Sequence, residues 1–443
     1  MKYINNSKLL DCKFSNGMPM LPYYHCGLIS KMNNISYASE MTTLLPLWKR
    51  IKNLMKSWKK IGVKRKSILI FSSTLFNVKN DNGIFNYMHS YYYNIYKNDT
   101  LLIEDGDLNF GWRTFDSVPC LSTVNSTMVF VASLFATLLN KIRPLHREDF
   151  IPFETDFSQH VLDSQLSRDD YFVKIYSFLL NILFDRVNPK CIILNCASYG
   201  HNMSVITYNA KKRGINVIEP QHGVIRKGPA YSASEIIVNS SEFNKCMPDV
   251  LFTFGEKWIQ GVDWKYEKYV VGSPYLNEYA EKKRDFVPDY DYLIISQPMS
   301  GENERNKVNF VKRLACIFPD KRILFRIHPS ENFSEQVNKY QGLDNISVSN
   351  STSVLYDDIT NSVYIVGWWS NCLYEALAFG KNPIIVDTSQ TREYMEQGVG
   401  IWIKDPSEIT ASILQKQNNI DFRQYWADNF EERVKMYLDS ILK

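Results

Sequence analysis

The chain has 443 residues, which is too long for one ordinary hydrophobic core, so two or three domains are expected. Hydrophobic residues at 45% and charged residues at 22% are typical of a packed globular protein and exclude extensive disorder. A net charge of +4 is too small for a protein that binds nucleic acid by neutralising phosphates. The eight cysteines have neither CxxC spacing nor histidine-rich partners, which indicates a reducing cytoplasm rather than disulfides or zinc.

The first distinctive segment is a basic amphipathic stretch, Leu44–Lys66. Its apolar residues, Trp48 and Trp58 among them, recur at helical spacing, and nine lysines and arginines cover much of the rest. This pattern fits either a helix at a membrane surface or a solvated helix packed on its own domain. Membrane association would be peripheral, at the inner face of the cytoplasmic membrane, because we find no signal peptide and no apolar run of about 18 residues. The longest apolar run, Met128–Leu139, predicts a buried helix.

Two series of short apolar runs rich in β-branched residues follow, separated by segments of helix length. This alternation predicts parallel α/β domains whose strands are buried on both faces. The first series comprises 67–73, 100–106, 191–198, 216–223, 250–255 and 268–274. The second comprises 292–298, 322–329, 362–370 and 382–387, with helices expected over Glu304–Ile317 and Cys372–Phe379.

The two series predict two doubly wound α/β domains. We place an N-terminal, acceptor-side domain at 1–277, a charged linker at 278–290 and a second domain at 291–420. Residues 421–443 are expected to form a C-terminal helix that crosses back to the first domain. Two such domains would enclose a cleft, and open α/β sheets bind ligands beyond the carboxyl ends of their strands.

Polar residues stand at strand ends in the second domain. His328 follows a predicted strand, and Pro329 after it favours an extended conformation that projects the imidazole from the sheet edge. Ser370 and Asn371 follow another strand and open a helix whose N-terminus would favour an anion. Glu375 on that helix is placed to reach a ribose hydroxyl. The structural alternatives are a capped or core histidine, a plain N-cap and an unremarkable helical glutamate.

The first domain offers candidates for a general base at two strand ends. Glu104 and Asp105 precede Gly106 at the end of one strand, and a carboxylate there could take a proton from an acceptor hydroxyl. His222 follows another strand and titrates near neutral pH. The alternatives are an Asp-Gly turn and a histidine that organises the turn at Gly223.

Taken in order, these short motifs resemble those of bacterial enzymes that build surface glycans. The Glu-Asp-Gly, His-Pro and serine elements resemble sialyltransferases and polysialyltransferases, which are GT-B enzymes that use CMP-sugars. The Gln-Pro and His-Pro pair is similar to that of Kdo transferases, and the Gln-His-Gly element with a later Gly-Ser-Pro resembles capsule transferases and teichoic-acid polymerases. The residues that carry the resemblance are Glu104–Gly106, Gln221–Gly223, Gly272–Pro274, Gln297, Pro298, His328, Pro329 and Ser370.

The resemblance implies a GT-B fold of two Rossmann-like domains facing a central cleft, and a role for each motif. His328 and Ser370 would hold the CMP phosphate, in a donor site that also includes Pro329, Asn371 and Glu375. Gln297 and Pro298 would shape the nucleotide pocket. Asp105 or Glu104 would be the catalytic carboxylate, with His222 as its competitor.

The function expected is transfer of an acidic sugar, such as sialic acid, Kdo or another nonulosonate, from a CMP donor to a glycan or glycolipid of capsule or lipopolysaccharide. No metal or further cofactor is expected, since a CMP leaving group carries a single phosphate. The alternatives are a UDP- or GDP-sugar or polyol-phosphate donor, a sugar epimerase, and a glycan-binding protein without activity. A metal-dependent GT-A transferase is a further alternative, because Asp105-Gly106-Asp107 spells DxD. Neither GxxxxGK[ST] nor a GxGxxG between strand and helix occurs, which disfavours an ATPase or a dehydrogenase.

Overall fold

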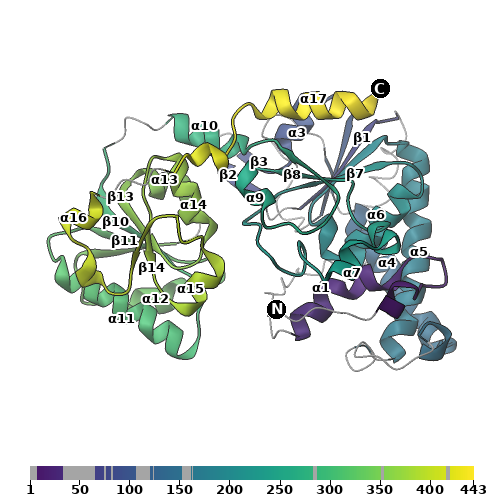
Figure 1. Cartoon of the computed structure of the whole chain (residues 1–443), viewed down its shortest axis with the longest axis horizontal. Coiled ribbons are helices and arrows are strands. Elements are labelled where there is room, and N and C mark those ends of the chain that lie inside the picture. The colour runs from purple at the N-terminus through teal and green to yellow at the C-terminus, as the bar shows by residue number, and fades with distance from the viewer. Residues whose placement is uncertain are drawn as a thin grey trace. The chain divides into compact units, whose positions relative to one another are not determined.

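The described part of the chain divides into two units, each built around one sheet (Figure 1). A computed structural model describes residues 7–32, 65–73, 76–80, 83–105, 120–122, 124–151, 161, 163–282, 287–350, 354–415 and 420–443. Unit 1 is Met1–Val271 with Asn429–Lys443, and unit 2 is Gly272–Asp428. The helix α10 (Pro274–Lys282), which overlaps the expected linker, belongs to unit 2.

Unit 1 contains a seven-stranded parallel sheet in the order β5-β4-β1-β6-β7-β8-β9. The chain starts in the middle, adds strands on one side and then returns to the other side of β1, which makes the sheet doubly wound. Strands such as β6 are buried along their whole length, as expected when helices cover both faces. The strands are β1 (Ile68–Ser73), β4 (Thr100–Asp105), β5 (Cys120–Ser122), β6 (Cys191–Leu194), β7 (Asn216–Pro220), β8 (Val250–Thr253) and β9 (Glu267–Val270).

Helices flank this sheet, and a small antiparallel hairpin of β2 (Asn77–Asn80) and β3 (Gly83–Asn86) follows β1. The C-terminal helix α17 (Phe430–Leu442) packs on unit 1, with Phe430, Val434 and Leu438 in the core around β1 and β8. The other helices are α1 (Met20–Met32), α3 (Ser90–Ile95), α4 (Val124–Ile142), α5 (Asp163–Val187), α6 (His201–Lys211), α7 (Glu235–Val238), α8 (Ser241–Asn244) and α9 (Glu256–Ile259), with 3-10 turns at Ser7–Leu10, Arg147–Asp149 and Ala197–Tyr199.

Unit 2 contains a six-stranded parallel sheet in the order β12-β11-β10-β13-β14-β15. In chain order this is 3-2-1-4-5-6, the strand order of a Rossmann fold. The strands β10 and β13 are neighbours, and the order of the strands reverses between them. The loops that follow these two strands therefore lead to opposite faces of the sheet. The strands are β10 (Tyr290–Ile295), β11 (Ile323–Arg326), β12 (Ile346–Ser349), β13 (Ser362–Gly367), β14 (Ile384–Val386) and β15 (Ile401–Ile403).

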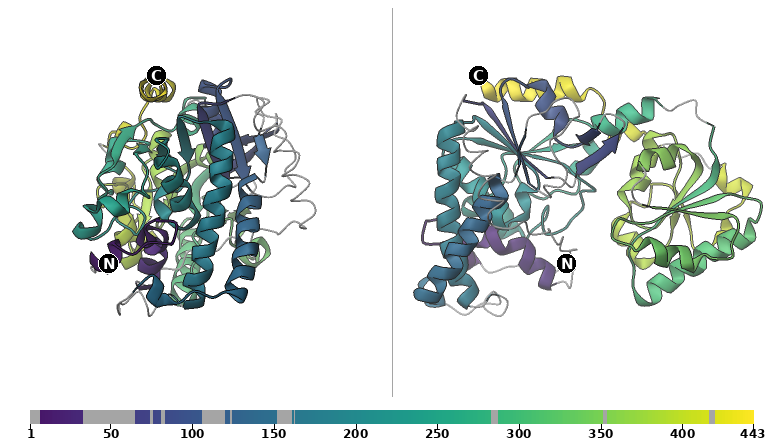
Figure 2. Two further views of the ribbon diagram at one scale, coloured as in Figure 1. Left: turned by 90° about the vertical axis from the view of Figure 1, so that its right-hand side faces the viewer. Right: turned by 180° about the vertical axis from the view of Figure 1, so that it is seen from behind.

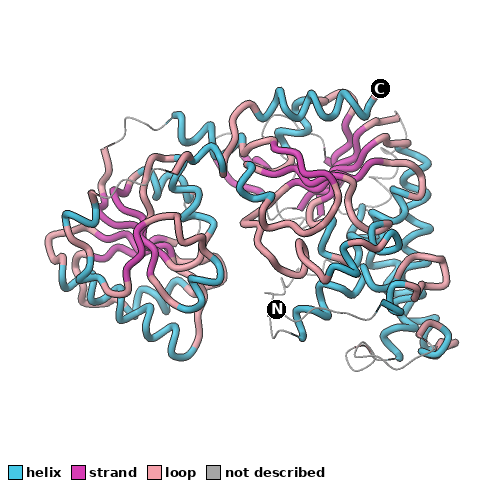
Figure 3. Tube along the Cα trace, in the orientation of Figure 1, coloured by secondary structure: helices cyan, strands magenta, loops and turns pink. Residues whose placement is uncertain are grey.

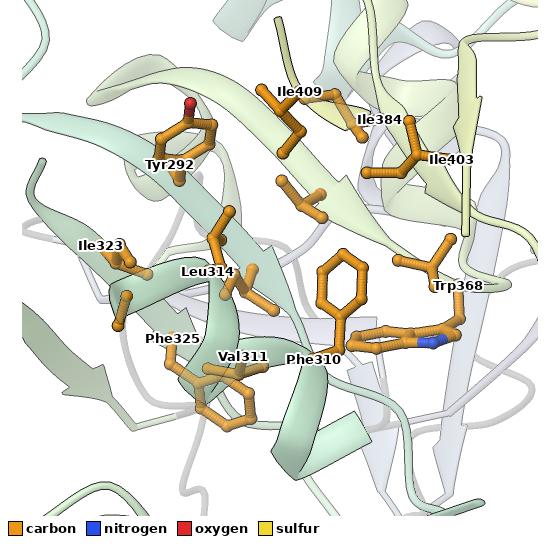
Figure 4. Packing of buried hydrophobic residues seen from close by; sticks show 14 of the residues in the cluster. Tyr292, Phe310, Val311, Leu314, Ile323, Phe325, Trp368, Ile384, Ile403 and Ile409 are labelled. Atoms are coloured by element: carbon orange, nitrogen blue, oxygen red, sulfur yellow. The ribbon is translucent and has the colours of Figure 1, made fainter. Parts of the chain in front are cut away.

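The core of unit 2 lies between this sheet and α11 (Gly301–Ile317). Phe310, Val311 and Leu314 recur at helical spacing and pack on the buried strands, with Trp368 beside Phe310 (Figure 4). In both units the strands lie inside and the helices outside (Figure 3). The other elements are α12 (Phe333–Lys339), α13 (Leu355–Thr360), α14 (Asn371–Ala378), α15 (Ser389–Tyr394), α16 (Ala411–Leu414) and 3-10 turns at Pro406–Glu408 and Phe422–Gln424.

The predicted fold class is confirmed, because both units are doubly wound α/β sheets of the kind that form a GT-B fold. All ten predicted strands occur, although most end two to four residues earlier than expected. The sequence pattern missed β2, β3, β5, β12 and β15, which are short and lie at sheet edges or outside the main sheets. Their few residues carry too little periodicity to be recognised.

Two helices differ from the sequence-based expectations, and a third expected helix lies mostly outside the described residues. The segment 421–443 is not one helix: a 3-10 turn at Phe422–Gln424 precedes α17, which begins only after Asn429 in the left-handed conformation. The apolar run Met128–Leu139 lies in α4 but is not buried throughout, since Leu134, Phe135, Leu138 and Leu139 are exposed. Residues 44–64 of the basic stretch lie outside the described residues.

Candidate functional site

A buried lysine ties together two strand ends of unit 2. The side chain of Lys307 on α11 is fully buried, and its Nζ donates to Ser296 Oγ at 3.0 Å and to the Gln297 carbonyl at 2.9 Å, just beyond β10. It also donates to Glu331 Oε1 at 2.7 Å, after β11, and pairs with Glu304 Oε2 at 2.8 Å. The ammonium group thus holds the ends of β10 and β11 in one arrangement. Nothing in the sequence pattern predicted Lys307 or Glu331.

The same network positions His328. The other carboxylate oxygen of Glu331, Oε2, accepts the backbone N–H of His328 at 2.8 Å. The His328 ring nitrogen Nδ1 accepts the Ser330 backbone N–H at 3.2 Å and lies 2.8 Å from Ser330 Oγ. Because Nδ1 is an acceptor, this hydrogen-bond network assigns the ring proton to Nε2. Burial lowers the pKa of His328, while Glu331 acts in the opposite sense, so the half-buried ring is a neutral N–H donor at neutral pH.

Ser370 is the N-cap of α14. It has extended backbone angles, and its Oγ accepts the Cys372 backbone N–H at 3.3 Å. The first turn of α14 contains no acidic residue, so the positive end of the helix dipole is not neutralised there. The structural alternative for Ser370 is therefore present in the structure, and it is compatible with a hydroxyl that also contacts a ligand. Asn371 is the first residue of the helix.

Glu375 lies one turn further along α14. Among the described residues its carboxyl forms no hydrogen bond or ion pair, and burial raises its pKa to about 7. The residue is half-buried rather than fully enclosed. A carboxyl group in this condition has unused hydrogen-bonding capacity, which a ligand hydroxyl would satisfy.

These groups follow β10, β11 and β13, three adjacent strands that meet the same sheet edge. Burial raises the pKa of Cys372 at the start of α14, and the charge of Arg326 at the end of β11 acts in the opposite sense. His328 follows β11 and Ser370 follows β13, the two strands on either side of β10, so both residues lie at the carboxyl edge of the sheet, near the strand-order reversal between β10 and β13 where open α/β sheets bind ligands. Pro298 and Pro329 are exposed, and Gln297 is half-buried with its carbonyl held by Lys307.

A pocket of about 340 Å³ opens beside the same edge. Lys307 lines it, so the pocket and the strand-end network share a wall. The remaining wall comes from polar α11 residues and from the ends of β13, β14 and β15, including Trp368, Trp369, Thr388 and Gln390.

In unit 1, His222 follows β7 and contacts residues that follow β6. Its Nε2 lies 3.7 Å from Cys196 Sγ and 3.3 Å from the Tyr199 hydroxyl. Burial lowers the pKa of His222 to about 4, so the imidazole is uncharged at neutral pH. The uncharged imidazole has a lone pair that can accept a proton, but the lowered pKa makes it a weaker base than an ordinary histidine. Cys196 has a left-handed backbone, with φ at 57°, which turns the chain sharply after the strand.

A buried carboxyl lies next to this histidine turn and was missed by the sequence analysis. Glu219 on β7 is fully buried, and its Oε2 accepts the Ser198 backbone N–H at 2.9 Å and the Ser198 hydroxyl. Burial raises the pKa of Glu219 to about 7, against the lowering effect of these hydrogen bonds. The detectable signal was an acid inside the otherwise apolar strand NVIEP. Glu219 thus fixes the loop after β6 that carries Cys196 and Tyr199.

The structure separates the candidates for the base. Glu104 is buried at the end of β4, and its register partners are Ser72 on β1 and Ser122 on β5. The strands β1 and β6 lie between β4 and β7, so the strand that carries Glu104 is about 14 Å across the sheet from the strand that precedes His222. The two residues therefore belong to different parts of the sheet edge. Asp105 is the last residue of β4; its side chain, Gly106 and Asp107 lie outside the described residues.

The described residues contain neither a candidate metal cluster nor a helix that could span a membrane. No group of three or more His, Cys, Asp or Glu side chains is arranged there to hold a metal ion. None of the described helices combines the length and the apolar character that crossing a bilayer requires.

Comparison with known proteins gives similarity to solved structures alone. Neither a protein-family model nor a curated protein matches the sequence. The chain is similar to UDP-GlcNAc 2-epimerase from Methanocaldococcus jannaschii, at 16% identity and a TM-score of 0.49, over 84% of this chain and 99% of that one. It is also similar to UDP-GlcNAc 2-epimerase from Neisseria meningitidis (12%, TM-score 0.46, 85% and 99%) and to MurG from Acinetobacter baumannii (8%, TM-score 0.40, 85% and 99%). At these values the similarities carry no inference about activity.

Proposed function

We propose that the protein is a glycosyltransferase that moves an acidic sugar from a CMP-activated donor to a glycan or glycolipid acceptor in capsule or lipopolysaccharide synthesis. The observation that carries this proposal is a set of hydrogen-bonding groups that follow β11 and β13 at the carboxyl edge of the sheet of unit 2. These are the neutral His328 ring, the start of α14 capped by Ser370, and the Glu375 carboxyl, which has no hydrogen-bond or ion-pair partner among the described residues.

The His328 ring and the α14 N-terminus support a phosphate site. The Nε2–H of His328, the Ser370 hydroxyl and the first backbone N–H groups of α14 are all donors, and a helix N-terminus favours an anion. Two cations act electrostatically on this region, Lys307 on His328 and Arg326 on Cys372, and each is paired with a carboxylate, at 2.7 Å and 2.5 Å respectively. Neutral donors and a helix dipole suit one phosphate better than a diphosphate, which supports a CMP donor over a UDP or GDP donor.

Glu375 supports recognition of the nucleoside. Its carboxyl is one helical turn beyond the phosphate donors, and a ribose hydroxyl would satisfy its free oxygens. Binding would favour the ionised carboxylate, because a carboxylate accepts hydrogen bonds from two hydroxyls at once. The nucleotide should therefore bind more tightly when Glu375 is ionised, that is, above about pH 7.

The proposed reaction forms one bond and breaks another. The acceptor hydroxyl oxygen attacks the anomeric carbon, the bond from that carbon to the phosphate oxygen breaks, and CMP leaves with the electron pair. A base takes the hydroxyl proton, and donors at the phosphate stabilise the charge that develops there. Among the candidates we choose His222, whose ring contacts Cys196 and Tyr199 in the loop after β6, and Glu104 and Asp105 are the competitors.

A nucleotide panel tests the proposal. We would measure the thermal shift with CMP, CDP, UDP, GDP and ADP, with and without magnesium, because a ligand that binds only the native state raises the melting temperature. The expected result is a selective, metal-independent shift with CMP that is lost in His328→Ala. A selective UDP or GDP shift would refute the CMP donor and keep a nucleotide-sugar enzyme, and no shift with any nucleotide would refute the proposal.

Turnover of CMP-sugar donors then distinguishes transfer from other chemistry. CMP release should require an acceptor and persist in EDTA, whereas an epimerase would convert its donor without an acceptor. His222→Ala should reduce turnover while leaving the CMP shift intact, and Glu104→Gln provides the comparison. Loss in Glu104→Gln with full activity in His222→Ala would move the base to β4.

A further inference from the structure

The outer face of α4 exposes large apolar side chains. The helix places Met128, Ala132 and Ala136 inward, and these residues are buried. Outward it places residues that remain 37% to 79% accessible: Leu134, Phe135, Leu138, Leu139 and Ile142, which we call the α4 apolar face. From Ala132 onward, small residues thus lie inside and large ones outside, the reverse of an ordinary surface helix. A gathered set of this kind usually marks an interaction site, unlike scattered single residues.

The α4 apolar face lies on a part of unit 1 that helix packing and side-chain hydrogen bonds hold in place. α4 and α5 run side by side and extend beyond the sheet on the side of α1 (Figure 2). Around the end of α4, the Asn140 side chain donates to the Ser164 carbonyl at 3.1 Å, and the Tyr171 hydroxyl donates to the Arg143 carbonyl at 2.9 Å. The face is therefore presented on a fixed support and does not depend on a change of fold.

Charge identifies the kind of surface that would cover this face. The sequence of α4, VNSTMVFVASLFATLLNKI, contains no aspartate or glutamate. Lys141 and Arg143 are exposed on either side of Ile142, the most exposed residue of the face. An apolar face with two basic side chains at one end fits the interface of a bilayer that contains anionic lipids, where the apolar chains enter the headgroup region and the cations meet phosphates.

We propose that unit 1 binds anionic lipid bilayers through the α4 apolar face, with the helix lying along the interface. α4 does not meet the requirements of a bilayer-crossing helix, which is consistent with a surface position. This site differs from the basic stretch Leu44–Lys66 considered above. The inference does not depend on sugar transfer, because the vesicle assay needs neither donor nor acceptor.

Co-sedimentation with vesicles tests this proposal. The full chain should sediment with vesicles of phosphatidylcholine and phosphatidylglycerol, less with phosphatidylcholine alone, and less at high salt. Phe135→Ser with Leu138→Ser should weaken binding by about tenfold or more, because each removes apolar surface that would enter the bilayer. The matched control, Phe333→Ser with Met436→Ser, removes exposed apolar residues from α12 and α17 and should bind like the wild type.

Two further measurements keep the proposal falsifiable. Lys141→Glu with Arg143→Glu should reduce binding to anionic vesicles without touching the apolar residues, and melting temperatures should show that every variant folds. Equal vesicle binding by the wild type and both α4 variants would overturn the proposal. So would a dimer in sedimentation velocity that is lost in Phe135→Ser with Leu138→Ser, because a second copy would then be the occupant.

Discussion

Replacing Lys307 with methionine should destabilise unit 2 and loosen the site at the same time. Methionine has a similar length and no charge, so Lys307→Met removes the buried ammonium and leaves Glu331 facing Ser296 without its cation. The Lys307 side chain is fully buried and that of Glu331 is 6% exposed, so solvent does not compensate the remaining charge. Breaking a buried pair from one side typically costs about 3–5 kcal/mol.

The assay is urea and thermal unfolding of the full chain. For a unit of this size each kcal/mol lowers the melting temperature by roughly 2–4 °C, so a decrease of roughly 6–20 °C is expected in the transition of unit 2. Lys312→Met is the matched control, since Lys312 lies on the same helix but is exposed, and it should remain within about 0.5 kcal/mol of the wild type.

A double variant identifies the cause. Adding Glu331→Gln to Lys307→Met removes the unpaired charge and keeps an oxygen for the His328 backbone N–H, so part of the stability should return. If Lys307→Met alone is as stable as Lys312→Met, then the network does not hold the strand ends together and the argument is refuted. A Lys307→Met protein that still binds CMP like the wild type would show that His328 is positioned without this network.

Three further substitutions change the helix cap Ser370, the carboxyl of Glu375 and Gly272, the first residue of unit 2. Ser370→Ala should destabilise unit 2 by about 1 kcal/mol in urea unfolding, because the Cys372 N–H loses its acceptor, and Ser370→Asp should not. For Glu375, the folded pKa of about 7 exceeds the usual 4.5, so the folded state holds the proton more tightly and stability falls as pH rises from about 4.5 to 7. Glu375→Gln should therefore gain up to about 3 kcal/mol relative to the wild type between pH 5 and pH 8, and an equal difference at both pH values would contradict the assigned burial. Gly272→Ala should lower the melting temperature clearly, because φ is +93° there and a Cβ would lie 2.1 Å from the Ala427 carbonyl oxygen; an unchanged melting temperature would show that the chain relaxes at no cost.

Local patterns in the sequence determined the elements and their class. Runs such as ILIFSS and YLIISQP are apolar enough to be buried on both faces, and helix-length segments between them require parallel strands. The strand-end positions of His328 and Ser370 followed from the same alternation, because the residue after a strand lies at the sheet edge. These predictions depend only on residues that are close together in the sequence, so they can be made without the tertiary structure.

Tertiary structure decided which strand ends meet and what surrounds each group. Lys307 and Glu331 are 24 residues apart in sequence, and Ser198 and Glu219 are 21 apart, so no local pattern connects them. Strand order likewise separated Glu104 from His222, which the sequence had offered as interchangeable bases. Burial and charge at a site depend on side chains that the fold brings together from distant segments. The periodicity of a single segment cannot predict these contacts. The outward α4 apolar face shows the same limit, since an apolar run does not reveal which of its sides the fold leaves uncovered.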